Sequence, residues 1–158
     1  MESRSGAPRG SLTVRLVDVT IREARDSDAE AIALLLGELG YPTDPGAVPR
    51  RLERMRAEGG QWTFVAERDG QVLGTATVVI RHMLSRDAPF GRVTTVVVSE
   101  GARSQGIGGA LIARAEEICR AAGCGALEVT SAAQRTRAHE FYLRLGFEDR
   151  PKRFIKQL

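Results

Sequence analysis

Cysteine and histidine are scarce in this chain, which excludes two common ways of stabilising a small protein. Its two cysteines, Cys119 and Cys124, are too few for a disulfide framework, and their spacing is not CxxC. Neither histidine, His82 or His139, stands beside them in a zinc-ligand pattern. We therefore expect two reduced thiols, no metal and a cytoplasmic location.

Long apolar runs and a strong charge imbalance are also missing. No stretch approaches the roughly 18–20 apolar residues of a membrane span, and residues 1–10 lead into no apolar segment of the kind that a secretory signal needs. The net charge is only +3, although an excess of arginine raises the isoelectric point to 9.3. This excess favours an anionic ligand but is too small to indicate nucleic acid. We expect no membrane partner and no nucleic-acid partner.

The chain has the size and pattern of one mixed α/β domain. Its 158 residues, 42% of them hydrophobic, suit a single globular unit. Strands are predicted at 20–24, 61–67, 72–81, 92–98 and 126–130, with one or two more within 147–158; a hairpin turn is predicted at Asp69-Gly70. Helices are predicted after a capping box at 27–30, around residues 48–56, up to Ala122 and over 136–145. Residues 1–19 are assigned to an N-terminal tail or strand extension, and residues 20–158 to the domain.

Residues 93–109 carry the pattern of a phosphate-binding turn: a β-branched strand, a glycine-rich turn and the start of a helix. A Walker A loop is excluded because Ile107 stands where lysine is required. A dinucleotide fingerprint begins at Gly106 and Gly108 but meets Leu111 where glycine or alanine belongs. Glu128, about 20 residues further on, keeps that second interpretation open.

A third loop type, R/Q-x-x-G-x-G/A, is matched by Arg103, Gly106 and Gly108. Together with TTVVVSEGARSQGIGGALIARAEEICRAAGCGALEVTS and, downstream, AHEFYLRLGFE, it resembles the GNAT superfamily of acyl-CoA-dependent N-acetyltransferases. The resemblance covers residues 20–158. It implies a central, mostly antiparallel sheet with a splayed parallel strand pair, flanked by helices.

The resemblance also implies acetyl-CoA as the co-substrate. Backbone N–H groups of 105–109 would hold the pyrophosphate, the central strand would pair with the pantetheine, and two positions in or before the last helix would contact the cofactor. The implied cofactor-binding residues are Val96, Val97, Val98, Arg103, Ser104, Gln105, Gly106, Ile107, Gly108, Gly109, Arg135 and Ala138.

Tyr142 is the expected general acid because it matches the family's tyrosine near the thioester sulfur. Its alternative is a core aromatic, a role that suits Phe141 better. The base is harder to assign, since Thr94 and Thr95 stand where many members carry a carboxylate, and Arg135 replaces an asparagine that binds pantetheine. The base candidates are Glu128, His82, Glu100, Asp87 and His139, with Glu128 entered as a weak candidate. No acyl-cysteine intermediate is expected, because neither cysteine has a base partner.

These expectations make the protein an N-acetyltransferase that moves acetyl directly to an amine of a small molecule, peptide or protein. The alternatives are a non-catalytic acyl-CoA-binding regulatory module and a nucleotide-binding Rossmann-type domain. The acceptor is not encoded in any motif that we can read. Homodimers are common in the family, and the resemblance leaves a homodimer open.

Overall fold

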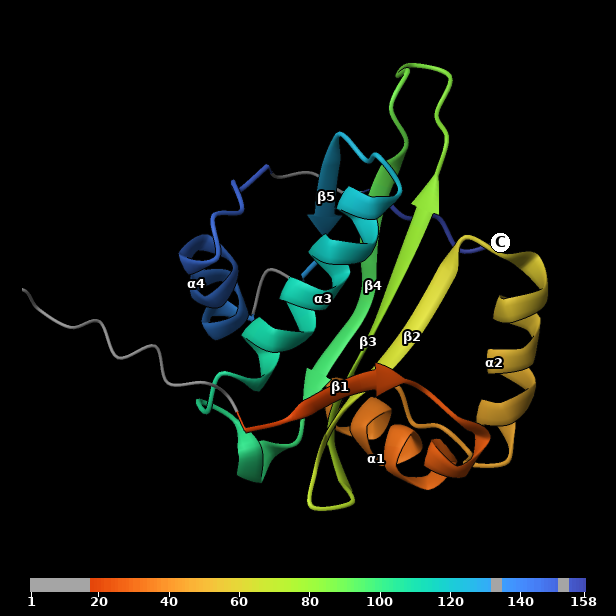
Figure 1. Cartoon of the computed structure of the whole chain (residues 1–158), viewed down its shortest axis with the longest axis vertical. Coiled ribbons are helices and arrows are strands. Elements are labelled where there is room, and N and C mark those ends of the chain that lie inside the picture. Colours follow the sequence, from red (N-terminus) through yellow and green to blue (C-terminus); the bar gives the residue numbers. More distant parts are fainter. Residues whose placement is uncertain (1–17, 132–134, 151–153) are drawn as a thin grey trace, which may run out of the picture.

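A computed structural model describes residues 18–131, 135–150 and 154–158 (Figure 1). In chain order its elements are β1 (Thr20–Glu23), η1 (Asp26–Asp28), α1 (Ala29–Leu39), α2 (Ala47–Glu58), β2 (Gln61–Arg68), β3 (Gln71–Arg81), β4 (Phe90–Val98), η2 (Glu100–Ala102), α3 (Ile107–Ala121), β5 (Ala126–Val129) and α4 (Thr136–Arg144). In this part of the chain, no helix is long and apolar enough to cross a membrane.

The described strands form one five-stranded sheet in the order β1-β2-β3-β4-β5. The first three pairings are antiparallel, and β4 pairs with β5 in parallel. The β2–β3 turn has positive φ at both Asp69 (51°) and Gly70 (76°), as a type I′ hairpin requires. The predicted mixed sheet and its Asp69-Gly70 turn are confirmed.

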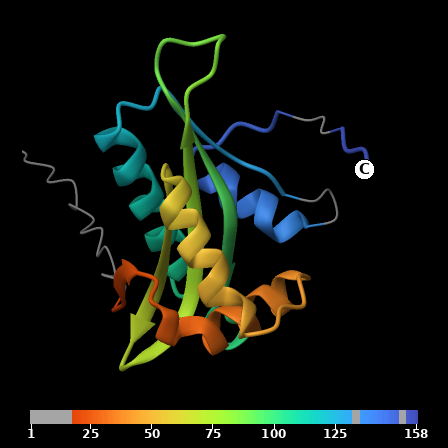
Figure 2. The same ribbon diagram turned by 90° about the vertical axis from the view of Figure 1, so that its right-hand side faces the viewer.

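Different helices cover the two faces of the sheet (Figure 2). Phe64 and Ala66 on β2 are buried in the cluster that contains the apolar side of α3. Val65, between them, is buried in the second cluster, with residues of α1 and α2. This alternation follows the two-residue period of a strand and explains why β2 is apolar on both faces.

The parallel pair comes apart halfway along β4. Pairing joins Phe90, Gly91, Arg92 and Val93 in turn to Ala126, Leu127, Glu128 and Val129. Residues 94–98 continue alongside β3, but no described strand pairs with their other edge. A bulge falls at the same point, since Thr77 lies opposite Thr95 and Val78 opposite Val93, which leaves Thr94 without a partner on β3. The predicted splay is thus present, and it opens at Thr94.

The predicted capping box at 27–30 is wrong. Helix α1 begins at Ala29, and its N-cap residue, Asp28, makes no capping bond to α1. The buried carboxylate of Asp28 instead accepts two hydrogen bonds from the Arg22 guanidinium, both 2.8 Å, and one from the Arg25 N–H, also 2.8 Å. This charge-assisted pairing between β1 and the start of α1 is stronger than a neutral cap.

The strands predicted at the two ends of the chain fall partly outside the described residues. Of residues 147–158, the described ones, 147–150 and 154–158, do not lie in a strand. Of the tail or strand extension predicted for residues 1–19, residues 1–17 lie outside the described residues. Asp18 and Val19 precede β1 and are not part of it.

Candidate active site

The open edge of β4 exposes the backbone groups of Val96 and Val98. The N–H of Ser99 donates to the carbonyl of Leu73 on β3 at 2.8 Å. Successive residues of a strand direct their N–H and C=O groups to alternate edges. The groups of Val96 and Val98 therefore point away from β3, toward the side that β5 has left. They form a strand edge to which an extended amide ligand can add.

One of these carbonyls is already engaged by a side chain of the following loop. Nε of Arg103 donates to the carbonyl of Val98 at 3.1 Å, and the Nη2 of Arg103 lies 3.4 Å from Oε2 of Glu38. Arg103 therefore links the end of β4 to the last turn of α1. This contact places the arginine of the predicted loop motif beside the open edge.

Helix α3 begins with unpaired N–H groups next to that edge. Its N-cap, Gly106, has φ 82°, and no described side chain caps it. The N–H of Ala110 is the one that donates to the Gly106 carbonyl, at 3.1 Å. The N–H groups of 107–109 accordingly have no partner within the helix, and the helix dipole adds partial positive charge there. This turn has the physical properties of an anion site.

Two adjacent glycines at this turn have different surroundings. A Cβ on Gly108 would lie 3.1 Å from Cζ of Phe141 and 3.8 Å from Cγ2 of Val98. A Cβ on Gly109 would meet no described atom within 4 Å. Gly108 thus allows α4 to approach α3 closely, whereas Gly109 faces open space beside the free N–H groups.

Tyr142 lies in an aromatic cluster on α4. Its ring makes edge contacts with Phe141 and Phe147, with centroids 5.1 and 5.6 Å away. Burial raises the pKa of the phenol, and the charge of Arg135 opposes that shift. The hydroxyl is therefore protonated at neutral pH and can act as a proton donor. All three rings pack against the core cluster that contains α3.

Glu128 is paired with a cation. Arg92 and Glu128 are register neighbours on β4 and β5, and the Arg92 guanidinium donates to the Glu128 carboxylate. Gly91, next to Arg92, faces Cys119 of α3, so the ion pair lies on the opposite face of the sheet. It is one register position from Val93 and Val129, where the strands part.

The other base candidates do not converge on one point. His82 and Asp87 are exposed in the loop between β3 and β4, and Glu100 is exposed in η2. His139 is half-buried in α4. Thr95 is half-buried and Thr94 exposed at the bulge, so hydroxyls stand there and no carboxylate does.

The remaining predicted cofactor residues lie on α4 and in the loop before α3. Arg135 is the exposed N-cap of α4, and its carbonyl accepts the His139 N–H at 3.1 Å. Ala138 is half-buried one turn along that helix. Ser104 is exposed, with φ 62°.

The cysteines are free thiols, as predicted. Cys119 is buried against Gly91, and burial raises its pKa to about 12, which keeps it a weak nucleophile. Among the described residues no group of three or more His, Cys, Asp or Glu could hold a metal.

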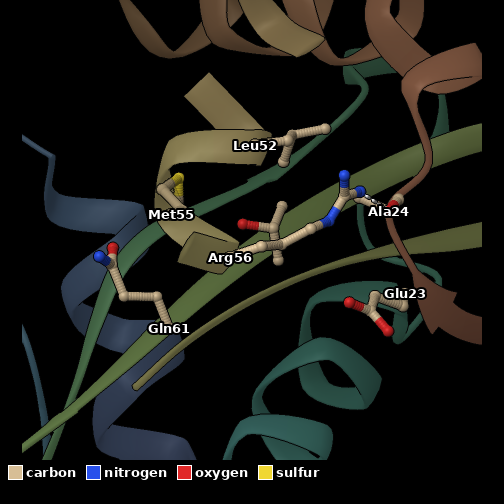
Figure 3. A pocket seen from close by; sticks show the side chains of 7 residues that line it. Glu23, Ala24, Leu52, Met55, Arg56 and Gln61 are labelled. Carbon is tan, nitrogen blue, oxygen red and sulfur yellow. Dashed lines mark hydrogen bonds between the residues drawn. The ribbon is translucent and has the colours of Figure 1, made fainter. Parts of the chain in front are cut away.

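Figure 3 shows a small recess that is lined by none of the predicted site residues. It lies between α2 and the edge formed by β1 and β2, and Arg56 spans it by donating to the Ala24 carbonyl at 2.9 Å. Leu52 and Met55 contribute apolar surface.

Two contacts of the loop were not predicted from the sequence. Glu38 accepts the N–H of Glu100 at 3.0 Å, and Nη1 of Arg68 donates to Oε1 of Gln105 at 2.9 Å. Glu38 and Arg68 lie far from the loop in sequence and belong to no motif. No local signal could have identified them.

The structure thus has a strand that loses its parallel neighbour beside an uncapped helix start, an arrangement of backbone groups that can hold an extended, phosphate-bearing ligand. The model of the acetyltransferase (GNAT) family matches residues 29–147. The chain belongs to this family. The predictions of fold, family and N-acetyltransferase class are confirmed.

Individual relatives agree with this assignment. The chain is 36% identical over 94 residues to an aminoalkylphosphonate N-acetyltransferase of Salmonella typhimurium, over 60% of this chain and 61% of that enzyme. It is 31% identical over 136 residues to a glucosamine 6-phosphate N-acetyltransferase of Trypanosoma brucei brucei, over 84% and 90% of the two chains. A crystal structure of a Trypanosoma brucei acetyltransferase superposes with a TM-score of 0.77 and 28% identity, over 89% of this chain and 100% of that one.

Proposed function

We propose that the protein moves the acetyl group of acetyl-CoA directly to an amine, with acetyl-CoA lying along the open edge of β4. The observation that carries this proposal is the meeting of a strand edge that no described strand pairs with and a helix start that no described side chain caps. The groups of Val96 and Val98 face the gap left by β5, and the unpaired N–H groups of 107–109 lie at its end. Pantetheine amides suit the first surface, and phosphate oxygens suit the second.

The cofactor residues divide by the chemistry that they offer. Val96 and Val98 offer backbone groups to the pantetheine, whereas those of Val97, between them, face β3. Residues 104–109 offer N–H groups to the pyrophosphate. Ser104 and Gly106 have positive φ (62° and 82°), which turns the loop so that its N–H groups can converge. Arg103 and Arg135 add positive charge, and Ala138 is kept as a proposed cofactor contact from the resemblance.

Tyr142 is the proposed proton donor to the leaving thiolate. In the transfer, the amine nitrogen bonds to the acetyl carbon, and the carbon–sulfur bond breaks. A thiolate leaves more easily when an acid protonates it. The phenol suits this role because burial raises its pKa and so keeps its proton in place.

The amine must first lose a proton, and we propose that water removes it. The threonines at the bulge offer hydroxyls that can hold such a water. Glu128 is kept as a candidate base, but its carboxylate is held by Arg92 in this structure.

The proposed acceptors are small molecules with a free amine. Relatives named for an aminoalkylphosphonate, glucosamine 6-phosphate and an aminoglycoside support this class. The predicted cytoplasmic location, the homodimer, the absence of a nucleic-acid partner and the division at residue 20 stay predictions.

A turnover assay that detects free CoA thiol across a panel of amines tests the proposal. We expect release of thiol with at least one amine and none without an acceptor. Tight CoA binding without turnover on any amine would favour the non-catalytic module. Failure of the folded protein to bind CoA would contradict both.

A further inference from the structure

We infer that Glu38, in the last turn of α1, is a positioning residue for the cofactor loop; this inference rests on the proposed function. Its Oε2 accepts the Glu100 N–H at 3.0 Å and lies 3.4 Å from Nη2 of Arg103. The two partners mark the start and the end of the turn that leads into residues 104–106. One carboxylate oxygen thus ties that turn to a helix on the other side of the sheet from α3.

The loop depends on such support because its own backbone bonds stop early. The Ala102 N–H donates to the Ser99 carbonyl at 2.9 Å, and the Arg103 N–H donates to the Glu100 carbonyl at 3.4 Å. Ser104 then takes φ 62°, a left-handed conformation that is unfavourable for a residue with a Cβ. Among the described residues, no cap at Gly106 fixes the loop to α3. Side-chain contacts therefore decide where the free N–H groups point.

A second contact supports the other end of the loop. Arg68, at the end of β2, donates through Nη1 to the Gln105 side chain at 2.9 Å and through Nε to the Asp18 carbonyl at 3.0 Å. Glu38 and Arg68 thus hold the loop at residues 100–103 and at residue 105. This arrangement fits a loop whose backbone must be placed before the cofactor arrives.

Substitutions at Glu38 can distinguish a role in positioning the loop from a direct electrostatic effect on CoA binding. A carboxylate near a pyrophosphate site repels the ligand, so removing the charge alone should strengthen CoA binding. Removing the hydrogen-bond acceptor should loosen the loop and weaken CoA binding. The two effects have opposite signs, which makes the substitution informative.

The test compares Glu38→Ala, Glu38→Gln and the control Glu53→Ala, an exposed glutamate of α2 without a hydrogen bond or ion pair to another described residue. CoA affinity is measured by calorimetry and loop order by hydrogen exchange of the 100–106 amides in the free protein. We expect Glu38→Ala to weaken CoA binding about fivefold or more and to speed exchange in the loop. The KM for acetyl-CoA should rise by a similar factor while kcat stays unchanged.

Rescue by the conservative variant is part of the expected result. Glu38→Gln keeps an oxygen acceptor for the Glu100 N–H, so its CoA affinity should stay within about twofold of wild type, like that of Glu53→Ala. Unchanged or tighter binding in Glu38→Ala, or equal losses in both Glu38 variants, would overturn the inference. If wild type fails to bind CoA, the proposed function is wrong; unchanged exchange in free Glu38→Ala would refute the positioning role independently.

Discussion

The ring of Phe141 packs against Gly108 so closely that a Cβ at Gly108 would lie 3.1 Å from the ring's Cζ. The contact joins α4 to the first turn of α3, and the ring of Tyr142, the next residue, packs against that of Phe141. It also changes how glycine substitutions in the loop should be interpreted. A side chain at position 108 meets the protein's own α4 before any ligand.

Gly109→Val is therefore the sharper test of where CoA binds. Its Cβ would meet no described atom within 4 Å, so we expect the variant to fold. The isopropyl group would project beside the free N–H groups and weaken CoA binding by about 2 kcal/mol, roughly thirtyfold. Calorimetry measures the affinity and thermal unfolding measures the stability.

Two controls accompany this variant. Gly37→Val, in α1, adds the same group where no described atom lies within 4 Å and should leave CoA affinity unchanged. Gly108→Val should lose both stability and affinity, because the Phe141 ring must move. Wild-type affinity in folded Gly109→Val would contradict the proposed placement of CoA.

Tyr142→Phe should lower kcat by about 10²–10⁴ if the phenol protonates the leaving thiolate. The ring and its contacts with Phe141 and Phe147 are kept, so CoA affinity and melting temperature should change little. Steady-state kinetics and calorimetry measure the two effects. Tyr41→Phe, at the other tyrosine, which is 66% exposed, is the matched control. A kcat within a few-fold of wild type would make Tyr142 a structural residue.

Local patterns in the sequence predicted two local features of the structure. The Asp69-Gly70 turn followed from two residues that tolerate positive φ, and the glycine-rich turn before α3 followed from glycines at the start of a helix. The splay of β4 from β5 came from resemblance. Nothing in the β-branched run of residues 93–98 shows where pairing stops.

Contacts between distant segments could not be predicted in the same way. The capping pattern at 27–30 is genuine in composition, yet the helical turn Asp26–Asp28 already contains Ser27, and Asp28 precedes α1 with its carboxylate paired to Arg22 of β1. Glu38 likewise reads as one more polar residue of an amphipathic helix. Its contact with Glu100 joins residues 62 positions apart.

The Asp28–Arg22 pair predicts an acid-dependent loss of stability. Hydrogen bonds from Arg22 hold the pKa of Asp28 below its ordinary 3.8, against a smaller opposing effect of burial. A carboxyl whose pKa is lowered by folding stabilises the protein above its unfolded pKa and loses that contribution as pH falls through the folded value. The stabilisation is thus complete above about pH 5 and declines below about pH 4.

Asp28→Asn should remove this dependence. We expect it to lower the free energy of unfolding at pH 7 by about 2–3 kcal/mol, because the guanidinium of Arg22, 19% exposed, then keeps Glu67 as its one charged partner among the described residues. Urea unfolding between pH 3 and pH 7 measures the effect, with exposed Asp149→Asn as the control. Parallel pH profiles for wild type and Asp28→Asn would show that this pair does not govern acid sensitivity.

The pH dependence of turnover tests whether the amine gives its proton to water or to a side chain. An aliphatic amine has a pKa near 10.4, so at pH 7 only about one molecule in two thousand is neutral. Thr94 and Thr95 at the bulge provide no carboxylate, and Glu128 is engaged by Arg92. We therefore expect kcat/KM to climb with pH toward the acceptor's own pKa. The pH–rate profile should have no additional limb between about pH 5 and 8 from the titration of an enzyme group.

Two acceptors whose amine pKa values differ make this measurement decisive. With water as the proton acceptor, the rising limb should shift with the amine. Glu128→Gln, His82→Ala and His139→Ala should leave the profile's shape unchanged. If a residue of the enzyme is the base, the limb should instead stay fixed when the amine is changed and disappear in one of these variants. A fixed limb that disappears in Glu128→Gln would mean that the Arg92 pair opens during turnover and that Glu128 takes the proton.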